Sequence, residues 1–490
     1  MGEKRLSDLL GLPSIGEGVV IKGITADSRL VKAGDLFVAL PGTVVDGREY
    51  IDAAIEKGAS AILTLKGTKV KNTNIPLIES RNPRRKYAEL AAKYYGKQPE
   101  NMVAVTGTNG KTSVAEFTRQ LWARMYVNAA SLGTLGVRST AVERPGGLTT
   151  PDPMALHEVL AELAEAGVTH AALEASSHGL SQHRLDGVTL KAAAFTNLTR
   201  DHLDYHGTEA NYFYTKLKLF GDLLTPDSAA VINIDAPYGR AVEEFCWGRG
   251  LKRYTVGHAS DAYMQILSIT PKQGFQQLAV KVEGKTYDIR IPLIGFFQAE
   301  NALMAAGLVM ATGYQPDDVL PHISTLKGVP GRMEFMGKTV MGGSVYVDYA
   351  HTPNGMETAL KSARAHKPSK ISVLFGCGGN RDAGKRPQMG AIAEELADKI
   401  FITDDNPRFE DPQVIRSEIL AATPSAVEIP NRKEAIKAAI EQLGKDEILL
   451  INGKGHELGQ SVAGEVLPHS DLAVVTQILT DMRREAADGK

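Results

Sequence analysis

The feature that most limits the fold is a short apolar run, a glycine-containing loop and an amphipathic segment in direct succession. Residues 102–105 read MVAV, residues 106–113 read TGTNGKTS, and residues 114–125 read VAEFTRQLWARM. In the last segment Val114, Phe117, Leu121 and Met125 recur at helical spacing. A buried strand, a loop and a helix in this order predict a phosphate-binding loop.

The residue types in this loop suit a nucleotide triphosphate. Gly107 and Gly110 allow the backbone to approach phosphate oxygens, Lys111 can reach the β- and γ-phosphates, and the Thr112 hydroxyl can hold Mg²⁺. The common eight-residue pattern has a glycine where this chain has Val105, so the loop is a short variant. The alternative, a glycine-rich turn with an exposed lysine, is disfavoured by the flanking strand and helix. We expect ATP and Mg²⁺ to bind at Gly107, Thr108, Asn109, Gly110, Lys111, Thr112 and Ser113.

Short apolar runs followed by amphipathic segments recur along the chain and predict parallel sheets covered on both faces. Examples are residues 171–174 (AALE), 192–195 (AAAF) and 371–375 (ISVLF). Polar, Gly/Pro-containing stretches at 94–101 and 326–334 look like domain boundaries. The predicted fold is α/β with three domains: a small N-terminal α/β domain (1–97), a central P-loop ATPase-like parallel-sheet domain (98–329) and a C-terminal Rossmann-like domain (330–490).

Composition excludes several classes of protein. The formal net charge is −2 over 490 residues, so no basic field favours nucleic acid. The chain has two cysteines, which cannot form a disulfide framework and fit the reducing cytoplasm. It lacks a signal-peptide pattern and an apolar stretch long enough to span a membrane. We therefore expect a cytoplasmic protein without membrane insertion.

Polar residues follow two further runs in the central part. Glu174 ends the run at 171–174, and a carboxylate at a strand end is a natural Mg²⁺ ligand, although such a residue is often a helix cap. The next run leads into 196–207 (TNLTRDHLDYHG), which contains His202. Several of these residues also suit turns, so the residues alone leave both interpretations open.

Six stretches in a fixed order resemble one protein family. These are TGTNGKTS (106–113), EASSHGLSQHR (174–184), FTNLTRDHLDYHG (195–207), VINID (231–235), VDYAHTP (347–353) and GKGHE (453–457). Together they resemble the Mur ligase family over nearly the whole chain. Within that family they are most similar to the branch that adds meso-diaminopimelate to a UDP-muramyl dipeptide in cytoplasmic peptidoglycan synthesis.

The resemblance implies a catalytic and metal-binding group of Lys111, Thr112, Glu174, His202 and Lys216. It implies that Lys216 is carbamylated, which would turn a cation into an oxygen-donor anion that Mg²⁺ prefers. The residues alone give a different interpretation, because Lys216 stands beside Lys218 and reads as a solvated helix charge.

The resemblance also implies a site for the muramyl dipeptide. Hydroxyl, amide and guanidinium groups suit a sugar, amides and a carboxylate. The implied residues are Thr149, Thr150, Ser177, Gln182 and Arg184, with Ser28 and the backbone at 43–45 for the uridine end. Two positions depart from the usual family pattern: Gln298 replaces an asparagine, and Leu148 replaces a polar residue found in some relatives.

The last domain carries the implied acceptor site. Arg332, Asp348 and His351 are expected to close over ATP. Arg408 can grip a carboxylate with paired N–H bonds, and L-lysine has no carboxylate at its far end, so a buried Arg408 would disfavour L-lysine. The implied acceptor residues are Arg381, Asp405, Asn406, Pro407, Arg408, Gly453 and Glu457.

Other functions stay open at this stage. A folylpolyglutamate-synthetase-like ligase would lack the uridine-binding first domain, and an L-lysine-adding relative would not need Arg408. A non-catalytic P-loop regulator would be expected to lose Glu174, His202 or Lys216, and a plain kinase would not need the acceptor pocket. The expected partners are UDP-MurNAc-dipeptide and meso-diaminopimelate, and the expected oligomeric state is a monomer.

Overall fold

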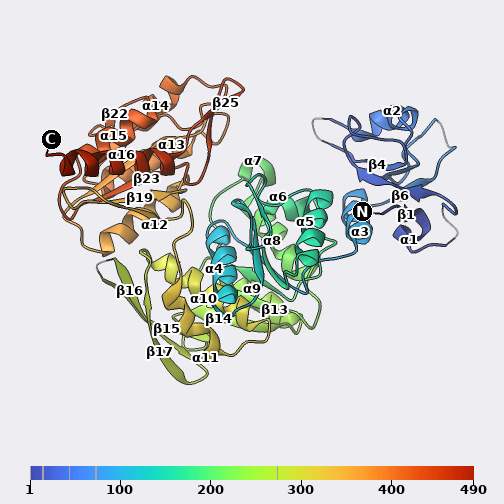
Figure 1. Ribbon diagram of the computed structural model, residues 1–490, viewed down its shortest axis with the longest axis horizontal. Helices are drawn as coiled ribbons and strands as arrows, with labels where there is room; N and C mark the ends of the chain where they lie inside the picture. Colours follow the sequence, from blue (N-terminus) through green and yellow to red (C-terminus); the bar gives the residue numbers. More distant parts are fainter. Residues whose placement is uncertain (1, 14–15, 43–44, 72–73, 273, 490) are drawn as a thin grey trace.

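A computed structural model describes residues 2–13, 16–42, 45–71, 74–272 and 274–489. Figure 1 shows an elongated molecule, with the N-terminal elements at one end, the C-terminal elements at the other, and a large sheet between them. The three-domain α/β architecture with parallel sheets is confirmed. In the described part of the chain, no helix is long and apolar enough to cross a bilayer.

The N-terminal sheet is parallel, in the order β3-β4-β5-β6. Its strands are β3 (Gly23–Thr25), β4 (Asp35–Ala39), β5 (Ala61–Leu65) and β6 (Leu77–Ser80). Around it lie β1 (Lys4–Arg5), α1 (Leu6–Leu10), β2 (Val20–Ile21), η1 (Gly47–Tyr50), α2 (Ile51–Glu56) and α3 (Pro83–Tyr95). The Asn82 side chain caps α3, Pro83 starts it, and Gly96 ends it in a left-handed conformation.

The central sheet has the order β10-β9-β8-β11-β7-β12-β13-β14-β15-β16-β17. Its strands are β7 (Asn101–Thr106), β8 (Ala129–Gly133), β9 (Gly136–Arg138), β10 (Glu143–Arg144), β11 (His170–Glu174), β12 (Ala192–Phe195), β13 (Ala229–Asn233), β14 (Lys252–Gly257), β15 (Met264–Lys272), β16 (Phe275–Val282) and β17 (Lys285–Ile291). In the order of the sheet, the neighbouring strands β8, β11, β7, β12, β13, β14 and β15 pair in parallel. Antiparallel strands extend both edges: β9 and β10 beside β8, and β16 and β17 beside β15.

Helices cover both faces of the central sheet. They are α4 (Lys111–Arg124), α5 (Pro153–Glu165), α6 (Ser177–Ser181), α7 (Leu203–His206), α8 (Glu209–Gly221), α9 (Gly239–Gly248), α10 (Phe296–Met310), α11 (Pro316–Val319) and η2 (Leu320–Thr325). Alternate residues of β7 belong to different cores: Val103 and Val105 pack with α4 and α10, whereas Met102 and Ala104 pack with α5 and α8. Continuous apolar runs are expected for strands buried on both faces.

The C-terminal sheet has the order β18-β19-β23-β20-β21-β22 and is parallel except for β18. Its strands are β18 (Glu334–Lys338), β19 (Ser344–Asp348), β20 (Ile371–Phe375), β21 (Lys399–Ile402), β22 (Val427–Glu428) and β23 (Ile448–Asn452), and a separate hairpin is formed by β24 (Gly459–Val462) and β25 (Glu465–Pro468). The helices are α12 (Pro353–Ala365), α13 (Lys385–Leu396), α14 (Pro412–Leu420), α15 (Arg432–Glu441) and α16 (Asp471–Ala487). The boundaries 97/98 and 329/330 fall between elements and stay predictions.

Candidate active site

The phosphate loop leaves β7 at the point where the central sheet reverses its strand order, which is where ligands bind in such sheets. Gly107 has φ 149° and Gly110 has φ 87°. A Cβ on Gly107 would lie 1.9 Å from Thr196 Oγ1, and one on Gly110 would lie 2.6 Å from Asn301 Oδ1. Both positions therefore need glycine, and the loop is packed tightly against the segment after β12.

Lys111 and Thr112 are the first two residues of α4, and the side chain of each forms hydrogen bonds within the site. Lys111 Nζ donates to the carbonyl oxygens of Gly107 at 3.0 Å and Thr108 at 2.9 Å. Thr112 Oγ1 donates to Glu174 Oε2 at 3.0 Å and accepts a hydrogen bond from Arg332 Nη2 at 3.2 Å. Thr112 thus links the end of β11 to the start of the C-terminal domain.

Glu174 is 2% exposed and its orientation is fixed by several donors. The Thr134 backbone N–H donates to Oε1 at 2.8 Å, and the Thr134 hydroxyl donates to Oε2 at 3.2 Å. These bonds satisfy a carboxylate that would otherwise be costly to bury, and they hold it beside the phosphate loop.

Lys216 corrects the interpretation drawn from the residues alone. Its side chain is 1% exposed, not solvated, and Nζ donates to the Gly107 carbonyl oxygen at 2.8 Å. Nζ also lies 4.4 Å from the Tyr212 ring centroid. Burial, reinforced by the nearby Lys111 cation, holds the pKa of Lys216 well below its usual value. The Lys216 amine is thus held directly against the phosphate loop.

His202 lies on the loop after β12 with φ 52°, a left-handed conformation that is uncommon outside glycine. Its Nε2 lies 3.5 Å from Asp201 Oδ2, and its ring stands edge-on to His178 with centroids 5.0 Å apart. The strained backbone turns the imidazole toward the crevice that also contains Asp201.

A small cavity of about 140 Å³ joins the phosphate loop to the C-terminal domain. Burial raises the pKa of Asp348, whose carboxylate accepts hydrogen bonds from the Met333 and Ala350 backbone N–H groups at 2.6 and 2.7 Å. Gln298 Nε2 donates to the Arg332 carbonyl oxygen at 3.1 Å. The cavity lining includes the expected nucleotide residues Asn109, Gly110, Ser113, Arg332, Asp348 and His351.

A second cavity, of about 630 Å³, collects most of the expected acceptor residues. From the central domain come Asp201 and His202, and from the C-terminal domain come His351, Arg381, Asp405, Asn406, Arg408, Gly453 and Glu457. Pro407 is buried behind this lining. Carboxylates and guanidinium groups therefore face one space, as recognition of a zwitterion requires.

The turn after β21 is built around Arg408, which has φ 55°. Its backbone N–H donates to the Ser461 carbonyl oxygen at 2.9 Å, so β24 holds the turn in place. Arg408 Nη1 donates to the Gly379 carbonyl oxygen at 2.8 Å. The side chain is partly exposed rather than buried, which corrects the earlier expectation and reduces the cost of leaving it unpaired.

The other acids of this turn have structural partners. Asp404 pairs with Arg416, Glu410 Oε2 pairs with Arg386 Nη2 at 2.8 Å, and Asp411 caps α14. These contacts explain the acids as supports of the turn.

Comparisons with known proteins point to the family that the six sequence stretches resemble. Three family models match: "Mur ligase family, catalytic domain" at 20–95, "Mur ligase middle domain" at 105–309 and "Mur ligase, glutamate ligase domain" at 331–455. A UDP-N-acetylmuramoyl-L-alanyl-D-glutamate–2,6-diaminopimelate ligase of Chelativorans sp. is 48% identical and covers 97% of this chain and 98% of the relative. The chain belongs to the Mur ligase family.

Two further relatives of this Mur ligase carry the same enzyme name. The one from Caulobacter vibrioides is 49% identical and covers 97% of this chain and 99% of its own. A solved structure of a UDP-N-acetylmuramoyl-L-alanyl-D-glutamate–2,6-diaminopimelate ligase superposes with a TM-score of 0.72, at 29% identity, covering 98% of this chain and 100% of that chain.

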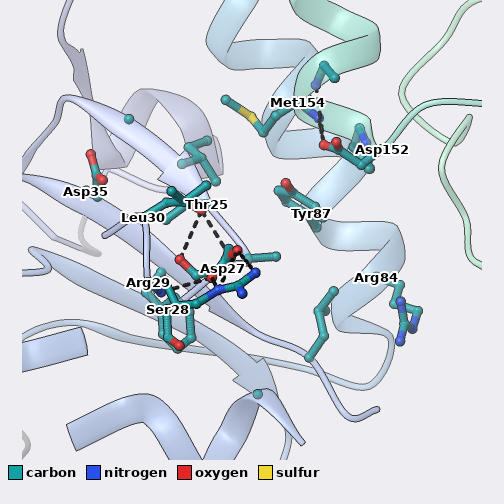
Figure 2. Close-up of a pocket in the computed structure, with 18 of the residues that line it drawn as sticks. Thr25, Asp27, Ser28, Arg29, Leu30, Asp35, Arg84, Tyr87, Asp152 and Met154 are labelled. Carbon is teal, nitrogen blue, oxygen red and sulfur yellow. Dashed lines mark hydrogen bonds and ion pairs between the residues drawn. The ribbon is translucent and has the colours of Figure 1, made fainter. Parts of the chain in front are cut away.

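A further cavity in this Mur ligase, of about 1120 Å³, lies between the N-terminal domain and the start of α5. Figure 2 shows the loop from Thr25 to Leu30 on one side and Tyr87 and Met154 on the other. The expected residues Ser28, Gln182 and Arg184 line it. Val45 also lines it, whereas residues 43 and 44 lie outside the described residues.

Three expected dipeptide residues lie between this cavity and the phosphate loop. Thr149 Oγ1 is 3.1 Å from Thr134 Oγ1. Thr150 is 1% exposed; its hydroxyl donates to the Glu174 carbonyl oxygen at 2.8 Å and accepts from the Ser176 N–H at 3.0 Å. Ser177 is buried at the start of α6. The Thr150 hydroxyl is thus already engaged within the protein.

Sequence reasoning missed several residues that line the cavities. Arg200, Asp382 and Lys385 line the acceptor cavity, and Lys385 Nζ donates to the His351 carbonyl oxygen at 2.8 Å. Arg84 lines the N-terminal cavity. Arg200 stood inside the recognised stretch 195–207, which was the available sign for it, and Lys385 follows the expected acceptor residue Arg381 by four positions. Nothing near Arg84 marked it.

Proposed function

We propose that this Mur ligase uses ATP to join meso-2,6-diaminopimelate to the D-glutamyl carboxylate of UDP-MurNAc-L-Ala-D-Glu. The observation that carries the proposal is the acceptor cavity, where Asp405, Glu457 and Arg408 face a space that opens toward His202. The names of the relatives support the same assignment. The cytoplasmic location and the monomeric state stay predictions.

The reaction proceeds through an acyl phosphate. The γ-phosphoryl group moves to the D-glutamyl carboxylate oxygen, and ADP leaves with the electrons of the broken P–O bond. Lys111 exchanges its hydrogen bonds to the Gly107 and Thr108 carbonyls for phosphate oxygens and offsets their charge. The acceptor amine then attacks the carbonyl carbon, loses a proton, and expels inorganic phosphate as the amide forms.

The donor set fits magnesium if Lys216 is carbamylated. Thr112 and Glu174 supply hard oxygen donors, and His202 supplies a nitrogen. No three His, Cys, Asp or Glu side chains in the described ranges cluster as a cation site. A carbamate on Lys216 would add an oxygen donor beside Thr112 and Glu174. The lowered pKa of Lys216 favours the neutral amine that reacts with CO₂. Bound Mg²⁺ would neutralise charge on the transferred phosphoryl group.

Acceptor choice rests on the far end of the amino acid. Asp405 and Glu457 can accept from its ammonium, and Arg408 and Arg381 can donate to its carboxylate. L-lysine offers no far carboxylate, so it loses the guanidinium contact. The N-terminal cavity, lined by Ser28, favours a UDP-linked substrate over a folylpolyglutamate-type one.

The test is product formation with a panel of acceptors. Purified protein is incubated with ATP, Mg²⁺, UDP-MurNAc-L-Ala-D-Glu and one of meso-diaminopimelate, L-lysine or L-ornithine. We expect ADP, phosphate and UDP-tripeptide in equal amounts with meso-diaminopimelate, and about a hundredth of that rate with L-lysine. ATP turnover independent of any acceptor would refute the ligase proposal, and equal rates with L-lysine would refute the role of Arg408.

A further inference from the structure

Lys454 is a fully buried cation beside the acceptor cavity. It lies between Gly453 and Gly455 on the loop after β23, and its exposed fraction is 0%. Its Nζ donates to Asn406 Oδ1 at 3.0 Å and to Glu457 Oε2 at 2.8 Å. A buried ammonium is costly unless it is paired, so these two contacts determine where the side chain lies.

The Lys454 ammonium fixes the orientation of the Asn406 amide. Both groups next to Asn406 Oδ1, Lys454 Nζ and the Ser461 backbone N–H at 2.9 Å, can only donate. The atom facing them must therefore be the oxygen, and Nδ2 must face the other way. Nδ2 donates to Glu457 Oε2 at 3.0 Å. The Asn406 N–H groups are thereby held on the side of Glu457.

The same contacts give the two oxygens of the Glu457 carboxylate different roles. Oε2 accepts from both Lys454 and Asn406, whereas no hydrogen bond to Oε1 is found among the described residues. Glu457 is partly exposed and lines the acceptor cavity, while Lys454 does not line it. One oxygen is therefore used for anchoring, and the other stays available to a ligand in the cavity.

We propose that Lys454 is a positioning residue for the acceptor amino acid. It holds Asn406 and Glu457 so that one carboxylate oxygen faces the substrate ammonium, without contacting the substrate itself. This inference rests on the proposed function, because the substrate ammonium is the group that Glu457 is positioned to receive. Without Lys454, Asn406 Oδ1 keeps only the Ser461 N–H and Glu457 Oε2 keeps only the Asn406 N–H, so both side chains are held less firmly.

The test is a steady-state comparison of Lys454→Met with the wild-type enzyme. Methionine is close in size but cannot donate. We expect KM for meso-diaminopimelate to rise about 10- to 100-fold, because hydrogen bonds to charged groups are lost, while KM for ATP and for the UDP-dipeptide stay within about twofold. The matched control is Lys437→Met, whose lysine pairs with Glu441 at 3.7 Å on the exposed face of α15; it should leave all three KM values unchanged.

A merely structural role would give a different result. A lower kcat with an unchanged KM for the acceptor would overturn the proposal, because it would mean that Lys454 does not position the groups that bind the acceptor. If Lys454→Met does not fold, Lys454→Gln, which retains a donor on a shorter side chain, takes the same test with the same criteria. The wild-type acceptor panel separates the two proposals: no acceptor-dependent product from wild type refutes the ligase function, whereas a normal wild type with an unaffected Lys454 variant refutes only the positioning role.

Discussion

Replacing Arg408 with methionine tests acceptor recognition most directly. In the described structure one guanidinium nitrogen bonds to the Gly379 carbonyl, and no acceptor is found for its other N–H groups. These groups face the acceptor cavity and are free to hold a carboxylate. A hydrogen bond between charged groups contributes about 1.5–3 kcal/mol, which corresponds to roughly 10- to 150-fold in kcat/KM.

The expected change is specific to the acceptor that has a far carboxylate. Arg408→Met should lower kcat/KM for meso-diaminopimelate by about 10- to 150-fold, yet alter the weak L-lysine reaction by less than about threefold. The fold should persist, because the backbone bonds of residue 408 to Ser461 and Ala463 do not involve the side chain. The left-handed backbone strain is the same for both residues.

The assay couples phosphate release to a chromatographic measurement of UDP-tripeptide with each acceptor. Arg364→Met is the control, because Arg364 forms an exposed ion pair with Asp398 at 2.7 Å in the same domain and should not affect either acceptor. An equal fall for meso-diaminopimelate and L-lysine would refute the reasoning, since it would mean that Arg408 supports the pocket and does not read the carboxylate.

Three other predictions follow from buried groups. Lys216→Met should abolish ligase turnover without lowering the thermal unfolding temperature, because it removes an amine that burial disfavours; a drop of several degrees would contradict this. Gly110→Ala should weaken ATP binding at least about tenfold in calorimetry through backbone strain and the 2.6 Å approach to Asn301, whereas Gly248→Ala, where a Cβ meets nothing within 4 Å, should not. Burial lowers the pKa of His157 to about 4, so its contribution to stability is full above the unfolded pKa of about 6.5 and is lost as pH falls toward 4, by up to about 3 kcal/mol; urea unfolding of His157→Leu should lack this loss.

The sequence predicted the parts of the fold that have a local pattern. Runs such as 102–105 and 371–375 are buried on both faces, so their apolar character is continuous and visible. The β15–β17 extension was not predicted. β16 (FQQLAVKV) does alternate buried with less buried residues, but the polar Gln276 is on its buried face and the apolar Ala279 on its other face, so its sequence hides the alternation. A half-exposed strand at a sheet edge carries less sequence information than a buried one.

The site was predicted residue by residue, but the burial of those residues was not. Lys216 and Lys218 are indistinguishable by type, and only the packing of α8 against the phosphate loop buries one of them. Arg408 was expected to be buried and is partly exposed, because the β24–β25 hairpin holds its backbone while its side chain reaches the cavity edge. Lys454 stood inside a recognised stretch, as does Glu457 three positions later, but its other hydrogen-bond partner, Asn406, is 48 positions away in the sequence. Such tertiary partners do not appear in a linear pattern.

The hydrogen bond from Arg332 to Thr112 has an evolutionary consequence. It joins the C-terminal domain to the phosphate loop at one of the first residues of that domain, whereas the proposed acceptor-reading loops leave β20, β21 and β23 on the same C-terminal sheet. A chimera that kept the segment from Arg332 through His351, which lines the nucleotide cavity, and exchanged the later strands and loops for those of another Mur ligase would keep the ATP end intact and receive a different amino-acid preference. The loops that select the acceptor amino acid can therefore diverge as one exchangeable segment, while the residues that bind ATP stay under separate selection.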